Sequence, residues 1–596
     1  MSGSIPALLR ERATATPYTE AFRHPDGTGW SSLSWSAVQE RVRRLALGLA
    51  GLGAGPGTTV AILSGTRVEW ILADLAVLAT GAATTTVYPS NTAEECAYII
   101  SDSGAALVVA ENAAQVAKLR GVRESIPAVR RVIVLDGEAD GDWVLPWPEL
   151  AATPDDPAAY DAMVDRIGPA DLATLIYTSG TTGRPKGVEL THGNWLYAAR
   201  AAREIALLAP DDLHFLWLPM SHSFGKLLEV VVIETGTPTA IDGRIDRIAA
   251  NLAELRPTVM AAAPRIFEKI HNTVVATVRR EGGLKPRIFR WAREVGVRMS
   301  RARQAGVTPS PWLRARYALA DRLVFAKLRA RFGGRIRYFI SGSAPLSPEM
   351  AEFFDAAGMT ILEGYGLTES SAGSFVNRPG QVRFGTVGPP MPGTLVRIAD
   401  DGEILIGGPG VMRGYHGLPE ETAAALHDGW LRTGDIGELD EAGRLRITDR
   451  KKELIKTSGG KYVAPQHIEG RIKAACPYLS HVVVHGDRRN FCTALVTLDP
   501  DVVLPWARAE GLPAEPSDLP ELARHPRLRQ VVREAVDAVN ATLASYETVK
   551  DFAILPADFS VETGELTASL KIRRKEVEAR NREVLDSFYA GSIGSA

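Results

Sequence analysis

Short apolar runs alternate with helical patterns through the first 264 residues. Apolar runs at 58–63, 83–88, 106–110 and 132–135 predict strands, and the periodic segments 68–79 and 93–101 predict helices. The same rhythm returns after residue 213, with strands expected at 215–218 and 259–263. Strands and helices that alternate at this spacing form parallel sheets covered on both faces. The pattern therefore predicts an α/β fold with two parallel-sheet halves of the αβαβα type.

The pattern changes towards the C-terminus. Short, glycine-rich strands at 395–398 and 402–406 predict a small β-barrel or antiparallel sheet. Beyond residue 450, helices are expected at 468–475 and 528–545, and strands at 481–485 and 494–498. This mixture predicts a separate, smaller α+β domain. The apolar stretch 70–87 contains Asp74 and Gly81, so a helix followed by a strand explains it better than a membrane span.

Composition narrows the class of protein. The chain has 596 residues, 45% of them hydrophobic, and its 68 Lys+Arg against 70 Asp+Glu give a formal net charge of −2. No global basic excess therefore argues for nucleic acid. Three scattered cysteines are too few for a disulfide framework or a zinc site, and the apolar run Ile5–Leu9 is too short for a secretory signal. We expect a cytoplasmic protein.

One segment is strongly basic although the whole chain is near neutral. Residues 279–337 contain seventeen Lys and Arg but only three acids, Glu281, Glu294 and Asp321. A solvated helical face is the ordinary explanation. The functional alternative is a docking surface for a multiply phosphorylated ligand or for an anionic membrane, to which the protein would bind peripherally.

A loop rich in hydroxyls lies between two expected strands at 172–176 and 188–191. Its glycines allow close approach of the backbone to a ligand, and its hydroxyls and lysine can donate to a polyanion. It is not a Walker A loop, because Gly183-Arg184-Pro185-Lys186-Gly187 ends in glycine where Gly-Lys-Ser/Thr should open a helix. The loop predicts a phosphate site made of Thr178, Ser179, Gly180, Thr181, Thr182, Gly183 and Lys186.

Two further loops follow apolar strands. The loop Gly342, Ser343, Ala344 and Pro345 follows the expected strand 337–340, and Glu363, Gly364, Tyr365, Gly366, Thr368 and Glu369 follow Ile361-Leu362. Loops at the carboxyl ends of parallel strands meet at one crevice, where ligands bind. The Tyr365 ring can stack on a purine, and Thr368 and Glu369 offer oxygens for a hard cation that carries phosphates. Taken alone, an aromatic between glycines is more often a packing residue.

A third cluster contains Asp435, Ile447 and Arg450. An aspartate after the tight Thr433-Gly434 turn can accept hydrogen bonds from the hydroxyls of a ribose, and Arg450 can bind the same sugar or its phosphate. The ordinary explanation of Asp435 is a turn residue. Lys571 lies in a basic stretch near the C-terminus, where its position alone predicts a solvated surface.

Five motifs together resemble, in order, the adenylate-forming (AMP-binding) superfamily. They are residues 177–187, 364–369, 432–435, 449–456 and 569–574, and the match spans nearly the whole chain. The phrase Ser458–Pro465 and the basic insert look most like long-chain fatty acyl-CoA synthetases.

The resemblance implies a two-step ligation. A carboxylate attacks the α-phosphate of ATP, carried with Mg²⁺, to give an acyl-adenylate and pyrophosphate, and the thiol of coenzyme A then displaces AMP. Cations and donors placed where charge develops lower the first barrier, and loss of one such group typically costs about 10²–10³ in rate. By matching position, Lys571 is implied to bridge the carboxylate and the α-phosphate.

Matching positions imply further roles. Thr178 to Lys186 would hold the β- and γ-phosphates, and Glu369 would bind magnesium. The α-phosphate would bind Thr368, and His222 would lie near the reacting carboxylate. Adenine would lie between Tyr365 and the 342–345 loop, and the ribose on Asp435 and Arg450. The ATP-binding set also includes Glu363, Gly364, Gly366 and Ile447.

The resemblance also implies that the C-terminal domain moves. Lys571 would leave after adenylation, and Ser458, Gly459 and Gly460 would turn towards the pantetheine of coenzyme A. Lys452 matches the hinge position of the family. The expected organisation is an N-terminal adenylation domain at 1–449, a hinge at 450–452 and a mobile C-terminal α+β lid at 453–596.

The segment Leu218–Lys226 matches the family segment beside the acyl pocket. It departs from the family at Gly225-Lys226, where Glu-Arg or Gly-Arg is common, so the pocket wall stays undefined. We expect a long-chain or bulky apolar carboxylic acid, polycyclic and terpenoid acids included. The alternatives are an enzyme that only adenylates or delivers the acyl group to a carrier protein, and a noncatalytic nucleotide-binding relative, against which the intact motif residues argue.

Overall fold

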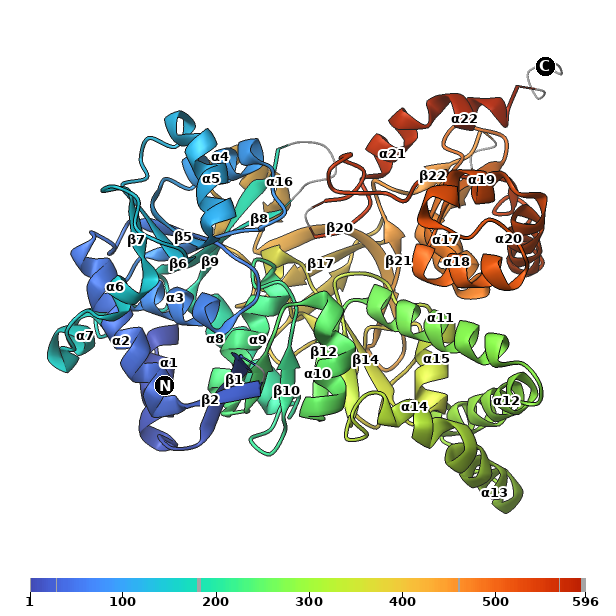
Figure 1. Ribbon diagram of the computed structural model, residues 1–596, viewed down its shortest axis with the longest axis horizontal. Helices are drawn as coiled ribbons and strands as arrows, with labels where there is room; N and C mark the ends of the chain where they lie inside the picture. The colour runs from blue at the N-terminus through green and yellow to red at the C-terminus, as the bar shows by residue number, and fades with distance from the viewer. Residues whose placement is uncertain (1, 28, 179–183, 459–460, 568, 591–596) are drawn as a thin grey trace.

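The computed structural model describes residues 2–27, 29–178, 184–458, 461–567 and 569–590. The fold contains two eight-stranded sheets, a smaller antiparallel sheet and a C-terminal α/β unit (Figure 1). The first sheet has the order β18-β9-β8-β4-β3-β5-β6-β7, with a parallel centre and antiparallel pairs at β8·β9 and β9·β18. Its strands are β3 (Thr59–Leu63), β4 (Ala83–Val87), β5 (Ala105–Asn112), β6 (Arg131–Asp136), β7 (Val144–Pro146), β8 (Leu172–Thr178), β9 (Lys186–Thr191) and β18 (Gly414–Tyr415).

The second sheet has the order β15-β14-β13-β12-β10-β11-β1-β2 and is parallel except at its two edges. Its strands are β1 (Glu20–Asp26), β2 (Gly29–Ser34), β10 (His214–Leu216), β11 (Thr239–Ile241), β12 (Val259–Ala262), β13 (Tyr338–Ser341), β14 (Thr360–Tyr365) and β15 (Phe375–Val376). The predicted parallel-sheet halves are therefore present, and every residue of β3, β4 and β12 is buried because helices cover both faces.

The helices around these sheets begin where the sequence supplies caps. Thr92 and Glu95 form a capping box at α4, and Thr191 and Asn194 do so at α8. The longer helices are α1 (Ile5–Ala15), α2 (Trp35–Gly51), α3 (Val68–Ala79), α4 (Ala93–Asp102), α5 (Ala113–Gly121), α8 (His192–Glu204), α9 (Ser223–Thr235), α11 (Pro264–Glu281), α12 (Lys285–Gln304) and α13 (Pro311–Ala320). Shorter ones are α6 (Trp147–Ala151), α7 (Pro157–Val164), α10 (Ile248–Leu255), the π-helix η3 (Asp321–Phe325), α14 (Ala326–Ala330), α15 (Pro348–Ala356) and α16 (Pro419–Ala425).

The predicted small β unit is an antiparallel sheet of five strands. They are β16 (Leu395–Ile398), β17 (Glu403–Gly407), β19 (Leu426–His427), β20 (Trp430–Leu439) and β21 (Leu445–Arg450). The long strand β20 pairs with β17 on one side and with β19 and β21 on the other. Of the two predicted alternatives, a small β-barrel and an antiparallel sheet, the strand pairings show the sheet.

The C-terminal unit has a hydrophobic core of its own, built from residues between Ile455 and Phe552. Its strands are β22 (Ile455–Lys456), β23 (Tyr462–Val463), β24 (Leu479–His485), β25 (Cys492–Leu498) and β26 (Val549–Ile554). Its helices are α17 (Pro465–Ala475), α18 (Pro500–Ala509), α19 (Leu519–Arg524), α20 (Pro526–Asn540), α21 (Arg574–Arg580) and α22 (Arg582–Ser587). In Figure 1 this unit, orange to red, lies beside β21 and over α11.

One predicted helix is too long. The segment 528–545 was expected to be helical throughout, but α20 ends at Asn540. The Asn540 amide donates to the Val549 carbonyl at 2.9 Å and its carbonyl accepts from Val549 N–H at 2.9 Å, which fixes the helix end against β26. Among the described residues, no helix is long and apolar enough to cross a membrane.

Candidate active site

The hydroxyl-rich loop joins two antiparallel strands, as predicted. Thr178 and Lys186 are register partners at the base of the β8–β9 hairpin. Helix α4 supports this base, because the Tyr98 hydroxyl donates to the Pro185 carbonyl at 2.9 Å and the Tyr177 hydroxyl donates to Asp102 at 2.6 Å. Ser179, Gly180, Thr181, Thr182 and Gly183 lie outside the described residues.

Tyr415, which the sequence motifs did not indicate, connects Lys186 to the predicted magnesium ligand Glu369. The Lys186 ammonium lies 5.0 Å from the centroid of the Tyr415 ring, and the Tyr415 hydroxyl donates to Glu369 Oε1 at 2.9 Å. β18 delivers Tyr415 by pairing with β9, where Tyr415 is opposite Val188. One aromatic side chain thus lies between a cation and a carboxylate that are far apart in the sequence.

Thr368 is buried beside the N-terminus of α9. Its hydroxyl is 3.1 Å from that of Ser223, the first residue of this helix. The N-terminus of α9 carries a partial positive charge from the helix dipole, which favours an anion at this point. Ser223 is a second residue that the motifs did not indicate.

The glycines around Tyr365 serve packing. A Cβ on Gly366 would lie 2.2 Å from the Ala372 carbonyl oxygen, and one on Gly364 would lie 3.1 Å from that of Phe375. Close approach of backbone to backbone therefore requires glycine at 366. The neighbouring carboxyl of Glu363 accepts from Leu346 N–H at 3.2 Å, and burial raises its pKa to about 7.

The 342–345 loop follows β13, beside the N-terminal turn of α9. Ser343 has φ = 71°, a left-handed conformation that is uncommon outside glycine. A Cβ on Gly342 would meet the Phe224 ring at 3.3 Å. The loop thus lies at the carboxyl end of β13, in the second sheet. This is the position predicted for a loop that lines a ligand crevice, and it holds Gly342, Ser343, Ala344 and Pro345.

Asp435 is held by the predicted nucleotide residues themselves. The Tyr365 hydroxyl donates to one carboxylate oxygen at 2.6 Å, and Arg450 Nε lies 3.1 Å from the other. Burial raises the pKa of Asp435, and Arg450 opposes this rise. Ile447 lies on β21 opposite Gly437 and packs on the core of the small sheet. A ribose bound to Asp435 would have to share or replace the contacts of Tyr365 and Arg450.

Lys571 belongs to the same site although it lies on the C-terminal unit. Desolvation, followed by the positive charge of Arg450, lowers its pKa to about 8, while Glu369 and Asp435 act in the opposite direction. The side chain remains exposed to solvent, so protein surrounds it without closing over it. A tight turn positions it: Thr567 N–H donates to the Lys571 carbonyl at 2.8 Å. The side chain is thus exposed, as its position alone predicted, but it also lies within the electrostatic influence of Arg450, Glu369 and Asp435.

His222 is a neutral hydrogen-bonding group. Burial and then the charge of Lys571 lower its pKa to about 3. Its Nδ1 accepts from Phe224 N–H at 3.1 Å as it caps α9, so the neutral ring carries its proton on Nε2. Nε2 is therefore a donor that a substrate carboxylate can use.

Lys226, the departure from the family, is turned into the core. It is fully buried, forms an ion pair with Asp74 on α3, and lies 3.2 Å from the carboxyl of Glu229, one turn further along α9. Its predecessor must be glycine, because a Cβ on Gly225 would lie 2.5 Å from the Pro219 carbonyl oxygen. Lys226 thus links α9 to α3. The side chain lies in the core and pairs with Asp74 there.

Helix α11 holds the C-terminal unit in this position. Glu268 pairs with Lys473 at 2.7 Å, and Lys269 pairs with Asp501 at 2.7 Å. Arg265 donates to the Ser480 hydroxyl at 3.1 Å. On the other side, Arg573, two residues after Lys571, lies 3.5 Å from Glu95 of α4. These contacts are polar, which is typical of a domain interface that can open.

The remaining predicted residues lie apart from this group. Lys452 is exposed in the turn after β21, and Ser458 is exposed where its N–H donates to the Arg489 carbonyl at 2.9 Å. Within the described ranges, no contact joins Ser458 to the nucleotide residues. Gly459 and Gly460 lie outside the described residues.

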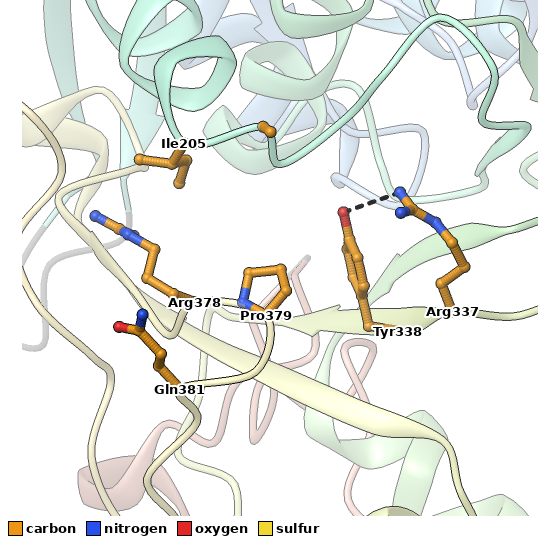
Figure 2. Close-up of a pocket in the computed structure, with 7 residues that line it drawn as sticks. Ile205, Arg337, Tyr338, Arg378, Pro379 and Gln381 are labelled. Carbon is orange, nitrogen blue, oxygen red and sulfur yellow. Dashed lines mark hydrogen bonds between the residues drawn. The ribbon is translucent and has the colours of Figure 1, made fainter.

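A separate pocket opens at the opposite edge of the second sheet. Figure 2 shows Ile205, Tyr338 and Arg378 around it, with a hydrogen bond between Arg337 and the Tyr338 hydroxyl at 3.4 Å. Tyr338 begins β13, whereas Gly342 follows the end of that strand. The pocket therefore does not include the candidate site.

The donor set suits a magnesium ion carried by phosphates. Magnesium is commonly bound by one or two carboxylates together with substrate phosphates and waters. Glu369 supplies one carboxylate, and over the described residues no cluster of three or more His, Cys, Asp or Glu offers a protein cage for a metal. A magnesium ion here would neutralise phosphate charge next to Lys186.

Comparisons with known proteins give one family over nearly the whole chain. The model of the AMP-binding enzyme family matches residues 9–416, and that of the AMP-binding enzyme C-terminal domain matches residues 452–592. The long-chain-fatty-acid–CoA ligase FadD15 of Mycobacterium bovis is 39% identical over 98% of this chain and 97% of its own. The peroxisomal long chain acyl-CoA synthetase 7 of Arabidopsis thaliana is 30% identical over 95% and 83%.

Solved structures share the fold. An anthranilate CoA ligase, AuaEII, in complex with anthranoyl-AMP, has a TM-score of 0.72 at 18% identity and covers 98% of each chain. A Mycobacterium tuberculosis fatty acyl CoA synthetase has a TM-score of 0.61 at 23% identity and covers 99% of each chain. Both the α/β architecture and the smaller C-terminal unit are thus common to these proteins.

Proposed function

The chain belongs to the AMP-binding enzyme family. We propose that its candidate site, which contains Asp435 and Lys571, catalyses the adenylation of a carboxylic acid. The chain is an AMP-forming acid–thiol ligase, which activates the acid with ATP and transfers the acyl group to coenzyme A. Its substrate is a long-chain fatty acid or a similarly bulky apolar acid. The long-chain ligases that match almost full length support this substrate class.

Lys571 supports the adenylation step most directly. The charges of Glu369 and Asp435 act on its ammonium, although desolvation and Arg450 lower its pKa overall. In this position it can bridge the attacking carboxylate and the α-phosphate, whose mutual repulsion opposes the reaction. A carboxylate oxygen then attacks phosphorus, and the bond from phosphorus to pyrophosphate breaks.

The other side chains bind and orient the reactants. His222 donates from Nε2 to the carboxylate, and Thr368 with the α9 N-terminus binds the α-phosphate. Lys186 and the loop before it bind the departing pyrophosphate. A magnesium ion on Glu369 would neutralise the phosphate charge during this step.

The second step requires Lys571 to leave. The thiolate of coenzyme A attacks the acyl carbon, and AMP departs with the electrons of the broken carbon–oxygen bond. We assign the hinge to residues 450–452, with Lys452 as its pivot, and we place Ser458, Gly459 and Gly460 along the path of coenzyme A after rotation. Of the contacts of α11 with the C-terminal unit, the exposed pair of Lys269 and Asp501 is weak enough to be broken in each cycle.

The test separates the two half-reactions. A panel of acids is incubated with ATP, with and without coenzyme A, and acyl-adenylate and acyl-CoA are both detected by mass spectrometry. We expect acyl-CoA to accumulate only with coenzyme A, and Lys571→Ala to lose adenylate formation while still converting a supplied acyl-adenylate to the thioester. Equal loss of both half-reactions would refute the role of Lys571. Acyl-adenylate that persists in the presence of coenzyme A would instead indicate an enzyme that only adenylates or that uses a carrier protein.

A further inference from the structure

The basic segment folds into a helical projection at the edge of the large domain. Helix α12 packs along α15, α13 packs on α12, and η3 continues directly from α13. In Figure 1 α13 protrudes at the lower right, away from the two large sheets. The projection therefore presents its outer surface without cover from the sheets or the C-terminal unit.

Large apolar side chains follow one face of α13 and η3. Trp312, Leu319 and Leu323 are 71%, 51% and 42% exposed. Spacings of seven and four residues place side chains on the same face of a helix. Single exposed apolar residues are ordinary, whereas a row of large ones marks an interaction surface.

Arg316 joins this row to α12. Its guanidinium carbon lies 5.8 Å from the ring centroid of Trp312 and 5.8 Å from that of Trp291. Along α12 the row continues to Ile288 and Leu284, which are 38% and 68% exposed and again three and four residues apart. We name this surface the tryptophan face: Leu284, Ile288, Trp291, Trp312, Leu319 and Leu323.

Exposed cations lie on the same helices as the tryptophan face. Lys285 and Arg301 are paired with Glu281 and Glu352. Many others are exposed and form no ion pair with any other described residue, namely Arg287, Arg290, Arg293, Arg298, Arg314, Arg322 and Lys327. A merely solvated helical face would account for the cations but not for the exposed tryptophan and leucines between them.

We propose that the tryptophan face is a docking surface for an anionic phospholipid bilayer. Tryptophan and leucine would enter the headgroup region, where amphipathic rings are favoured, and the arginines would bind lipid phosphates. The charge is complementary to anionic lipid, and the apolar row distinguishes a bilayer from a nucleic acid or a free phosphorylated ligand, neither of which would cover leucines. The inference does not depend on the ligase reaction, since binding needs no substrate.

The experiment is sedimentation of the full-length protein with vesicles of phosphatidylcholine, with and without phosphatidylglycerol. We expect binding to the anionic vesicles that weakens at high salt. Neutralising Arg287, Arg298 and Arg322 to glutamine, which follow the apolar row at helical spacing, should weaken it about 100-fold, if each contributes about fivefold. The control triple variant Arg41→Gln, Arg166→Gln and Arg247→Gln removes the same charge from exposed positions elsewhere, where the described residues offer no ion pair, and should bind like the wild type.

A second measurement locates the contact. Lipids with brominated acyl chains quench tryptophan fluorescence, so Trp312→Phe should retain binding but lose part of the quenching, whereas Tyr18→Ser, at another exposed aromatic, should change neither. Equal weakening by both triple variants would overturn the proposal. So would a fall in oligomer mass when the tryptophan face is substituted, which would assign the surface to a second copy, or binding to an oligonucleotide with no binding to vesicles.

Discussion

The charge of Lys571 predicts how adenylation depends on pH. Desolvation and Arg450 bring its pKa to about 8, from an ordinary value near 10.5. A lysine with this pKa is about 90% charged at pH 7 and about 10% charged at pH 9. The cation that bridges the two anions is therefore lost as pH rises, and the rate should fall about tenfold for each pH unit above 8.

The assay is the exchange of pyrophosphate into ATP at limiting acid and without coenzyme A, whose thiol titrates in the same range. The pH dependence of kcat/KM for ATP reports groups of the free enzyme. We expect its basic limb near pH 8. The limb in kcat should lie higher, because bound phosphates add negative charge beside Lys571 and favour its protonated form.

Two observations make this prediction specific. Tyr365 and Tyr415 do not titrate near pH 8, because burial raises the pKa of both hydroxyls well above their usual range. Lys571→Arg keeps a permanent cation and should remove the limb, although the different shape of arginine is expected to lower the rate. A limb with the same midpoint in Lys571→Arg, or a flat profile to about pH 10 in the wild type, would refute the assignment of the bridging cation to Lys571.

Three further predictions follow from the hinge, the tyrosine bridge and the domain interface. Lys452→Pro should leave adenylation intact and slow thioester formation, because proline restricts backbone rotation at the proposed pivot; parallel loss of both activities would contradict this. Tyr415→Phe removes a hydrogen bond to the Glu369 carboxylate and should slow adenylation about tenfold or more, most strongly at limiting magnesium; an unchanged magnesium dependence would leave the hydroxyl without a role. Glu268→Lys should weaken the docking of the C-terminal unit and adenylation with it, and the charge swap with Lys473→Glu should restore both, as a double-mutant cycle would measure; no coupling between the two substitutions would exclude a working ion pair.

Much of the fold follows from local pattern, because each layer is encoded by consecutive residues. The helix expected at 68–79 is α3, and the strand expected at 395–398 is β16. The first is a largely apolar run that ends just before Gly81, and the second ends just before the turn at 400–401. The end of α20 could not be predicted in the same way, since Asn540 is fixed by a tertiary contact with Val549.

The candidate site divides similarly. Glycine-rich motifs at strand ends indicated Lys186, Glu369 and Asp435, because chemistry and backbone geometry leave a signature in adjacent residues. Tyr415 has no such signature: it lies in a two-residue strand and reaches the site only because β18 pairs with β9. The position of Lys571 likewise depends on how the C-terminal unit packs against α11, which no local pattern encodes.

The buried group of Lys226, Asp74 and Glu229 couples folding to protons. Desolvation, reinforced by the charge of Asp74 and opposed by that of Lys226, raises the pKa of Glu229 well above its usual range. The native protein therefore retains a proton that the unfolded chain releases, so this site makes folding a proton-uptake reaction. Its contribution to the free energy of unfolding falls as pH rises from the ordinary glutamate pKa to the raised one, by up to about 1.4 kcal/mol for each pH unit. Rising pH should consequently weaken the contact between α3 and α9.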